Sequence, residues 1–334
     1  LHVGQINTTG LMPTITWNEQ PINLGALTNP GAVAVDATGG VYVISKTRTA
    51  DPSGAHSYIA YIPSGDNQWP EAGLNLFDRP TGFLADIATW GTGSQAVIAH
   101  RDTSGGEDHA FGQTWVSSVT SSGLGGPPFA PDDKGYEPRG VTIGGSLAYV
   151  ANYSTETGDD GATSVGSISV LSASTLQKVT GAEAAIQTGS FQPSDIAFFS
   201  LGDTNYLGMV GVKDGTSQAW RIELDANGLP LVEVSASGEL IGGNVLRRTL
   251  QGSGEGYCTL SPDGTTFWIT NPKTGNVTAL DTRTWQGTNL TIAANPGYIA
   301  AFTPADSPVP EPSSVLALLT GAVGLFGAMK RRRR

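Results

Sequence analysis

The chain has 334 residues, of which 45 are glycine and only 14% are charged. Its net charge is −11, but five of the 18 basic residues end the chain, so residues 1–329 carry a net charge of −16. Because a protein body this acidic repels nucleic acid and anionic lipid, we exclude nucleic-acid partners. Short apolar runs separated by Gly, Ser, Thr and Asn favour an all-β fold over helix bundles and alternating β/α folds.

One signature recurs along the chain: a polar residue, a proline, a short turn and then a strand. Five copies carry the proline and a sixth lacks it; they lie at 29–35, 79–85, 137–143, 192–198, 254–260 (no proline) and 295–301. The prolines are 50, 58, 55 and 103 residues apart, and the copy without proline falls inside the longest gap. A period of about 40 to 60 residues is typical of the blades of a β-propeller.

Five of the six repeats continue with a second apolar strand and four of these with a third. We expect the second strands at 41–44, 96–99, 148–151, 207–210 and 267–270. We expect the third strands at 58–62, 168–171, 219–224 and 277–280. Because Asp-Gly, Gly-Gly and Asn-Gly pairs supply hairpin turns between them, each repeat predicts a sheet of three or four antiparallel strands.

The most regular copy runs from Leu260-Ser261-Pro262-Asp263-Gly264 through Phe267-Trp268-Ile269-Thr270-Asn271 to Asp281. It resembles the YVTN family of propeller repeats, and Tyr149-Val150-Ala151-Asn152 is a second, shorter match. The resemblance is specific over this copy and loose elsewhere. It implies a propeller in which Asp263-Gly264 forms a hairpin turn and the following strand packs between neighbouring blades.

Six repeat starts predict a single β-propeller of about six blades over residues 1–304. The last blade, beginning at Asn295, would be completed by an N-terminal strand such as Thr14–Trp17, which closes the ring and hides its edges. Seven blades would fit a truncated chain. A pair of β-sandwiches or a solenoid is the alternative architecture.

In a propeller, the segments leading into the innermost strands lie at one face, around the central channel. That face would gather the polar residues of the repeat starts: Asn29, Arg79, Glu137, Arg139, Gln192, Asp195, Glu255 and Asn295. Convergent polar groups at a channel mouth predict a ligand site. The alternative is that these side chains satisfy the backbone of six similar turns. We assign no catalytic, cofactor-binding or metal-ligating residue and expect no cofactor. Calcium is the ion that could bind.

Other polar clusters have a simple interpretation as solvated loops. Segments 100–102 and 107–109 contain two histidines and three carboxylates, which could hold a metal, but hairpin loops are often this polar. Loop 156–161 is acidic enough for calcium, although its spacing matches no EF-hand. The one cysteine, Cys258, excludes an intramolecular disulfide and is expected to be buried in a strand. The sequons at Asn7, Asn152, Asn276 and Asn289 are expected by chance in so Asn- and Thr-rich a chain.

The C-terminus combines three elements in order: a linker, 305–312, with the motif Pro310-Glu311-Pro312, an uncharged apolar stretch, 313–329, and the basic residues 330–334. As a helix, the apolar stretch would be about 25 Å long, at the short end of what crosses a bilayer. The basic end stays cytoplasmic by the positive-inside rule, which places residues 1–312 outside. A plain tail anchor or a buried core helix is the alternative.

This order resembles the PEP-CTERM sorting signal of bacterial exported proteins. In that family a transpeptidase-like membrane protease, exosortase, cleaves near the motif and releases or transfers the body. The resemblance implies exosortase as a partner and a precursor held in the inner membrane by its C-terminal helix. The mature protein would then lie at the cell surface or outside the cell. Such proteins need an N-terminal signal peptide, and because Leu1-His2-Val3 begins none, the signal was removed or the sequence is a fragment.

Two functions from different classes follow. PEP-CTERM proteins are associated with exopolysaccharide and biofilm matrices, so the first is a non-enzymatic propeller that binds a polysaccharide or a surface protein. The second is a secreted hydrolase or lactonase-like propeller, in which two or three of Glu137, Asp195 and Glu255 hold a divalent ion at the channel mouth. The sequence lacks Gly-x-Ser-x-Gly, His-Glu-x-x-His and phosphate-loop motifs, which favours the binding protein.

Overall fold

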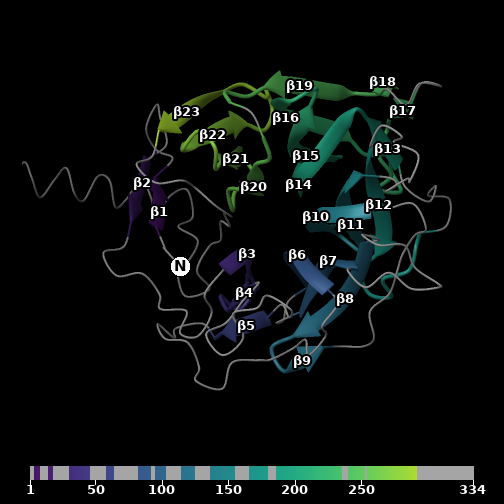
Figure 1. Ribbon diagram of the computed structural model, residues 1–334, viewed down its shortest axis with the longest axis vertical. Coiled ribbons are helices and arrows are strands. Elements are labelled where there is room, and N and C mark those ends of the chain that lie inside the picture. The colour runs from purple at the N-terminus through teal and green to yellow at the C-terminus, as the bar shows by residue number, and fades with distance from the viewer. Residues whose placement is uncertain are drawn as a thin grey trace, which may run out of the picture.

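The computed structural model describes residues 4–7, 14–17, 30–45, 58–63, 82–91, 95–102, 114–124, 136–154, 165–179, 186–234, 240–252 and 254–291. These residues form five antiparallel sheets set like blades around a central axis (Figure 1). A single β-propeller is therefore confirmed.

The five blades, numbered I to V in chain order, contain three or four strands each. Blade I contains β3 (Pro30–Val35), β4 (Val41–Ser45) and β5 (Tyr58–Ile62). Blade II contains β6 (Gly82–Trp90), β7 (Gln95–Asp102), β8 (Thr114–Thr120) and β9 (Gly123–Leu124). Blade III contains β10 (Tyr136–Gly144), β11 (Leu147–Ser154), β12 (Gly166–Ser172) and β13 (Ile186–Gly189).

The C-terminal half of the ring follows the same order. Blade IV contains β14 (Phe191–Leu201), β15 (Thr204–Lys213), β16 (Thr216–Glu223) and β19 (Val245–Thr249). A small hairpin, β17 (Glu233–Val234) and β18 (Leu240–Gly242), is inserted before β19. Blade V contains β20 (Tyr257–Leu260), β21 (Thr266–Asn271), β22 (Asn276–Asp281) and β23 (Gly287–Thr291). Every second and third strand predicted from the sequence lies within or overlaps one of these strands.

The predicted number of about six or seven blades is wrong for the described part of the chain, which has five. The repeat start at Asn295 lies outside the described residues, and so does the blade that it would begin. Its expected partner, β2 (Thr14–Trp17), instead pairs with β1 (Gly4–Asn7) in a separate two-stranded sheet. In Figure 1 this pair lies between blades V and I.

Tight turns allow each blade to fold back on itself. Asp214 and Gly215 connect β15 to β16 with both φ angles positive, at 50° and 76°. Two positive φ angles define the type I′ turn, whose twist matches that of the two strands it joins. Aspartate and glycine tolerate this conformation, and so the sequence alone indicates the hairpin.

The hydrophobic core lies between the blades, where the faces of neighbouring sheets pack against one another. Between blades III and IV, Phe191 stacks on Trp220 with ring centroids 4.1 Å apart and Met209 is fully buried beside them. Between blades IV and V, Phe267 and Trp285 pack 5.1 Å apart. Burial of such aromatic side chains supplies the main free energy that holds the ring together.

The sorting tail lies outside the described residues, and so does its predicted membrane helix, 313–329. Within the residues that are described, no helix is long and apolar enough to cross a membrane.

Candidate functional site

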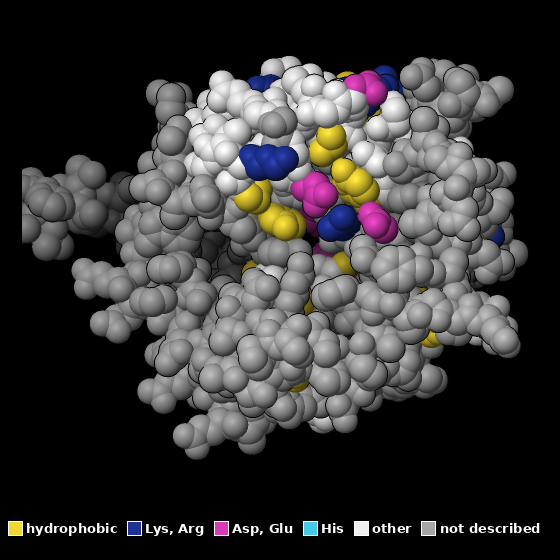
Figure 2. Space-filling view, in the orientation of Figure 1, with side chains coloured by type: hydrophobic (Ala, Val, Ile, Leu, Met, Phe, Trp, Pro, Cys, Tyr) yellow, Lys and Arg dark blue, Asp and Glu magenta, His cyan; other side chains and the backbone are white. Residues whose placement is uncertain are grey.

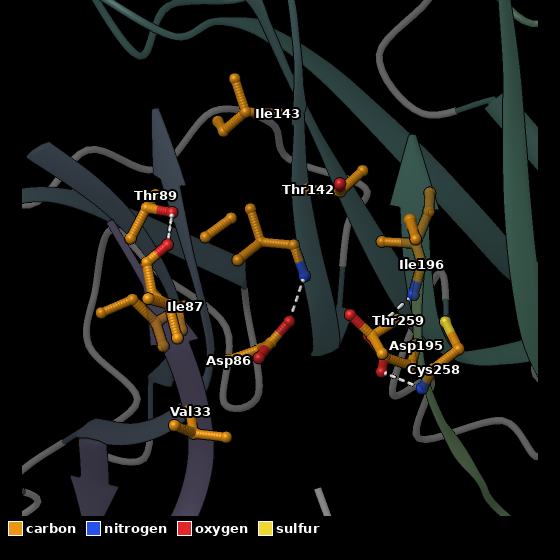
Figure 3. Close-up of a pocket in the computed structure, with 15 residues that line it drawn as sticks. Val33, Asp86, Ile87, Thr89, Thr142, Ile143, Asp195, Ile196, Cys258 and Thr259 are labelled. Carbon is orange, nitrogen blue, oxygen red and sulfur yellow. Dashed lines mark hydrogen bonds between the residues drawn. The ribbon is translucent and has the colours of Figure 1, made fainter. Parts of the chain in front are cut away.

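The innermost strands of the five blades surround a cavity of about 200 Å³ on the propeller axis. Each of the five strands contributes two to four consecutive residues to its wall, and Figure 3 shows this wall from close by. The lining is almost entirely aliphatic or hydroxylated, with two carboxyl groups, Asp86 of β6 and Asp195 of β14.

A β-bulge at the start of four inner strands sets which side chains face the channel. The register shifts between Pro30 and Val33, Leu84 and Asp86, Pro138 and Gly140, and Pro193 and Asp195. Leu84-Ala85-Asp86 is therefore equivalent to Pro193-Ser194-Asp195. The predicted repeat start at Pro80 lies four residues before the equivalent position, so the sequence alignment of this blade was wrong. Because a bulge inserts a residue, proline alone does not define the register.

Asp86 and Asp195 each hold two neighbouring blades together. An Asp86 carboxylate oxygen accepts the backbone N–H of Val141 in blade III at 2.8 Å. The equivalent oxygen of Asp195 accepts the N–H of Cys258 in blade V at 2.6 Å, and its second oxygen accepts the N–H of Ile196 at 2.8 Å. A Cβ on Gly140 would lie 2.7 Å from the Asp195 Cα, so this approach of blades III and IV requires glycine.

Burial changes the ionisation of both carboxyl groups. It raises the pKa of Asp195 to about 7, against the lowering effect of the hydrogen bonds from Cys258 and Ile196. Burial and then the charge of Asp195 raise the pKa of Asp86 well above its ordinary value. The thiol pKa of Cys258 is also raised, first by burial and then by the two aspartates. Cys258 is a buried strand residue, as predicted, and its high thiol pKa does not favour a nucleophile.

Three charged residues that the sequence singled out come together at the channel mouth. Arg139 in the bulge of β10 lies 3.7 Å from the Glu137 carboxylate and 3.6 Å from that of Glu255, which precedes β20. The guanidinium lies over the Tyr153 ring, 5.1 Å from its centroid. Figure 2 shows acidic and basic side chains gathered around the hollow at the centre of this face. We call Glu137, Arg139, Glu255 and Tyr153 the mouth cluster.

The mouth cluster has two further features of a functional surface. Glu137 has a φ of 53°, which is uncommon for a residue other than glycine. Burial, and then the charge of Glu255, raises the pKa of Tyr153. The cluster joins blades III and V across the start of blade IV, so its geometry depends on how these three blades pack around the axis.

The remaining predicted site residues fall elsewhere. Gln192 is half-buried in β14, and Asp195 lies in the channel wall, apart from the three ion-paired residues. Three of the eight lie outside the described residues: Asn29, Arg79 and Asn295.

The described residues include no group of three or more His, Cys, Asp or Glu side chains that could hold a metal ion. His100 of the first predicted cluster is buried, with its Nε2 3.0 Å from the Ser117 hydroxyl. Segment 107–109 and the whole of loop 156–161 lie outside the described part of the chain. Glu137 and Glu255 share Arg139, a cation of the protein itself, rather than converge with Asp195 on a vacant position.

Sequence reasoning missed Asp86, although a signal was present. Residues 86–88 and 195–197 are both Asp-Ile-Ala, and both occupy the same position after a bulge. Alignment on proline concealed the match, since blade II has leucine where blade IV has proline.

The fold and the site define a β-propeller with a polar channel mouth. Residues 308–334 match the PEP-CTERM protein-sorting motif, so this propeller belongs to a chain addressed to the bacterial cell envelope or surface, with exosortase as its processing enzyme. No curated protein matches the chain in sequence.

Solved structures are similar in fold. A chain of the nidogen/laminin complex is 13% identical, with 81% of this chain and 84% of that chain covered and a TM-score of 0.51. A putative 6-phosphogluconolactonase from Bacteroides uniformis is 14% identical, with coverage of 89% and 79% and a TM-score of 0.48. The Dos1 propeller is 13% identical, with coverage of 82% and 64% and a TM-score of 0.44. At such identities the likeness concerns the fold alone.

Proposed function

We propose that this chain is an exported surface or extracellular-matrix protein whose propeller binds a polysaccharide, or a protein that carries one, at the mouth cluster. The observation that carries the proposal is the ion-paired arrangement of Glu137, Arg139 and Glu255 across the channel mouth. The sorting motif at 308–334 supports an extracellular place of action.

The chemistry of the mouth cluster suits a hydroxylated ligand. Two carboxylates supply hydrogen-bond acceptors and one guanidinium supplies donors in a fixed fork, so neighbouring sugar hydroxyls can both donate and accept there. The Nε of Arg139 is buried without a hydrogen-bond partner, although the rest of the side chain is partly exposed. The strained backbone of Glu137 supports the same conclusion, because such strain is found most often at functional positions.

The hydrolase alternative has less support. It requires a carboxylate set that converges on a divalent ion, whereas Glu137 and Glu255 converge on Arg139. Nothing in the described residues favours it over binding.

The binding proposal is tested with the processed protein and with the extracellular polysaccharide of the bacterium that produces this protein. Glu137→Gln and Glu255→Gln keep the size of each side chain and remove its charge, and Arg139→Gln removes the positive charge and shortens the side chain. We expect each to weaken retention on the polysaccharide about tenfold, the effect of about 1.4 kcal/mol. Lys178→Gln, at an exposed position in blade III, is the control and should bind as the wild type does. Unchanged retention in all three mouth variants would contradict the proposal.

A further inference from the structure

Asp86 and Asp195 are two buried acids in the wall of the channel. They are only 8% and 5% exposed, and in Figure 3 their carboxyl groups point toward one another from β6 and β14. Neither belongs to the mouth cluster, and the proposed binding function uses neither. Each instead accepts a backbone N–H from the inner strand of the next blade.

No described cation lies between them. The channel residues from β3 and β10 are aliphatic or hydroxylated, and β20 contributes Cys258 and Thr259. At the mouth, Arg139 is already paired with Glu137 and Glu255. Two like charges buried face to face without a cation are strongly unfavourable, so one of them is expected to keep a proton.

We propose that Asp86 and Asp195 are a proton-holding pair that makes the stability of the propeller ring depend on pH. At neutral pH the pair retains at least one proton in the channel. Loss of that proton places two negative charges on groups that join blade II to III and blade IV to V. A rise in pH therefore weakens the ring at its axis.

The direction of this pH dependence follows from the pKa of the aspartates in the folded and in the unfolded chain. An aspartate in an unfolded chain has a pKa near 4, whereas burial raises the pKa of folded Asp195 to about 7. Because the folded chain holds the proton more tightly, this stabilisation is complete below about pH 4 and is lost as the pH rises to about 7. One such group changes the folding equilibrium constant by up to about tenfold per pH unit in that window.

The test is urea unfolding of the full-length chain in mild detergent, followed by tryptophan fluorescence at pH 5 and pH 8. We expect the wild-type folding constant to fall between these values by at least about tenfold. Asp86→Asn keeps an oxygen that can accept the Val141 N–H, and it should be more stable than the wild type at pH 8. The double variant Asp86→Asn, Asp195→Asn should lose most of the pH dependence. Asp214→Asn removes an exposed charge from the β15–β16 turn and should keep the wild-type pH dependence.

A double variant with the wild-type pH dependence would overturn the proposal. If the variants fail to fold, infrared spectroscopy of the folded wild type decides the question instead. A protonated-carboxyl C=O band that persists at pH 6 and disappears above pH 8 is the expected result. Absence of that band at pH 6 would show that both acids are ionised, and the proposal would be wrong.

Discussion

At the scale of single residues, the structure explains why both YVTN-like stretches end in asparagine, since both side chains are buried and form hydrogen bonds. Asn152 accepts a 2.7 Å hydrogen bond from the Thr114 hydroxyl of blade II and donates to Ser167 and Ser169 in its own blade. Asn271 ends the other YVTN-like stretch, and its amide lies 3.4 Å from the Ser217 hydroxyl of blade IV. Each asparagine thus connects the second strand of its blade to the third strand of the preceding blade.

Replacement of Asn152 by alanine should lower the free energy of unfolding by about 2–3 kcal/mol, because buried hydroxyl partners are left unsatisfied. Urea unfolding of the single variant measures this loss. Asn289→Ala is the matched control, since Asn289 also occupies a sequon but is exposed. It should cost less than about 1 kcal/mol, and equal losses for the two variants would argue against a special role for the buried position.

At the scale of elements, the turn between β22 and β23 joins blade V to blade IV. Arg248 of β19 donates to the side-chain oxygen of Gln286 at 2.9 Å and to the carbonyl of Gly287 at 3.0 Å. Arg221 of β16 donates to the carbonyls of Thr282 and Arg283. Beneath them Trp285 is buried and donates its indole N–H to the Ala219 carbonyl. Arg221 and Arg248, two of the few basic residues of an acidic chain, therefore form hydrogen bonds between blades IV and V.

Arg248→Ala should lower the free energy of unfolding by about 1–2 kcal/mol, since it removes charge-assisted hydrogen bonds that are partly open to solvent. The thermal unfolding midpoints of the wild type and of the variants measure this loss. Lys178→Ala, an exposed cation in blade III, should change stability by no more than about 0.5 kcal/mol. A wild-type midpoint for Arg248→Ala would mean that Trp285 and Arg221 hold the turn without Arg248.

At the scale of the whole molecule, one chain contains a propeller body and a sorting motif with different chemistry. Residues 1–329 carry a net charge of −16, and the last five residues are all basic. The PEP-CTERM match covers 308–334, beyond the last described strand, β23, which ends at Thr291. Processing at the motif would therefore leave the five described blades intact.

Mass spectrometry of the mature protein from a bacterium with an exosortase should find a C-terminus near Pro312. Substitution of Pro310, Glu311 and Pro312 by alanine should leave the basic tail attached and the chain in the membrane fraction. The same three substitutions should not alter the unfolding midpoint of the body. An intact tail of arginines on mature wild-type protein would contradict processing at this motif.

Local patterns made most of the strands predictable. Tyr58–Ile62 alternates in a way that indicates a strand, and the structure has β5 at those residues. The mouth residues Glu137, Arg139 and Glu255 could be named because each lies near a repeat start. The pairing of Arg139 with Glu255 could not be predicted, since these residues are more than a hundred positions apart. Asp86 was missed because a bulge, which depends on strand pairing, shifts the register in blade II.

The sequence by itself determined the fold class, the repeats and the sorting motif, because strand alternation, turn residues and a terminal signal are local properties. Only the tertiary structure decided the number of described blades, the meeting of the mouth cluster and the burial of two acids opposite one another. These depend on the packing of successive blades, which brings distant strands to one axis. Burial there, rather than the identity of the residue, makes Asp86 and Asp195 differ from the exposed acids of the same chain.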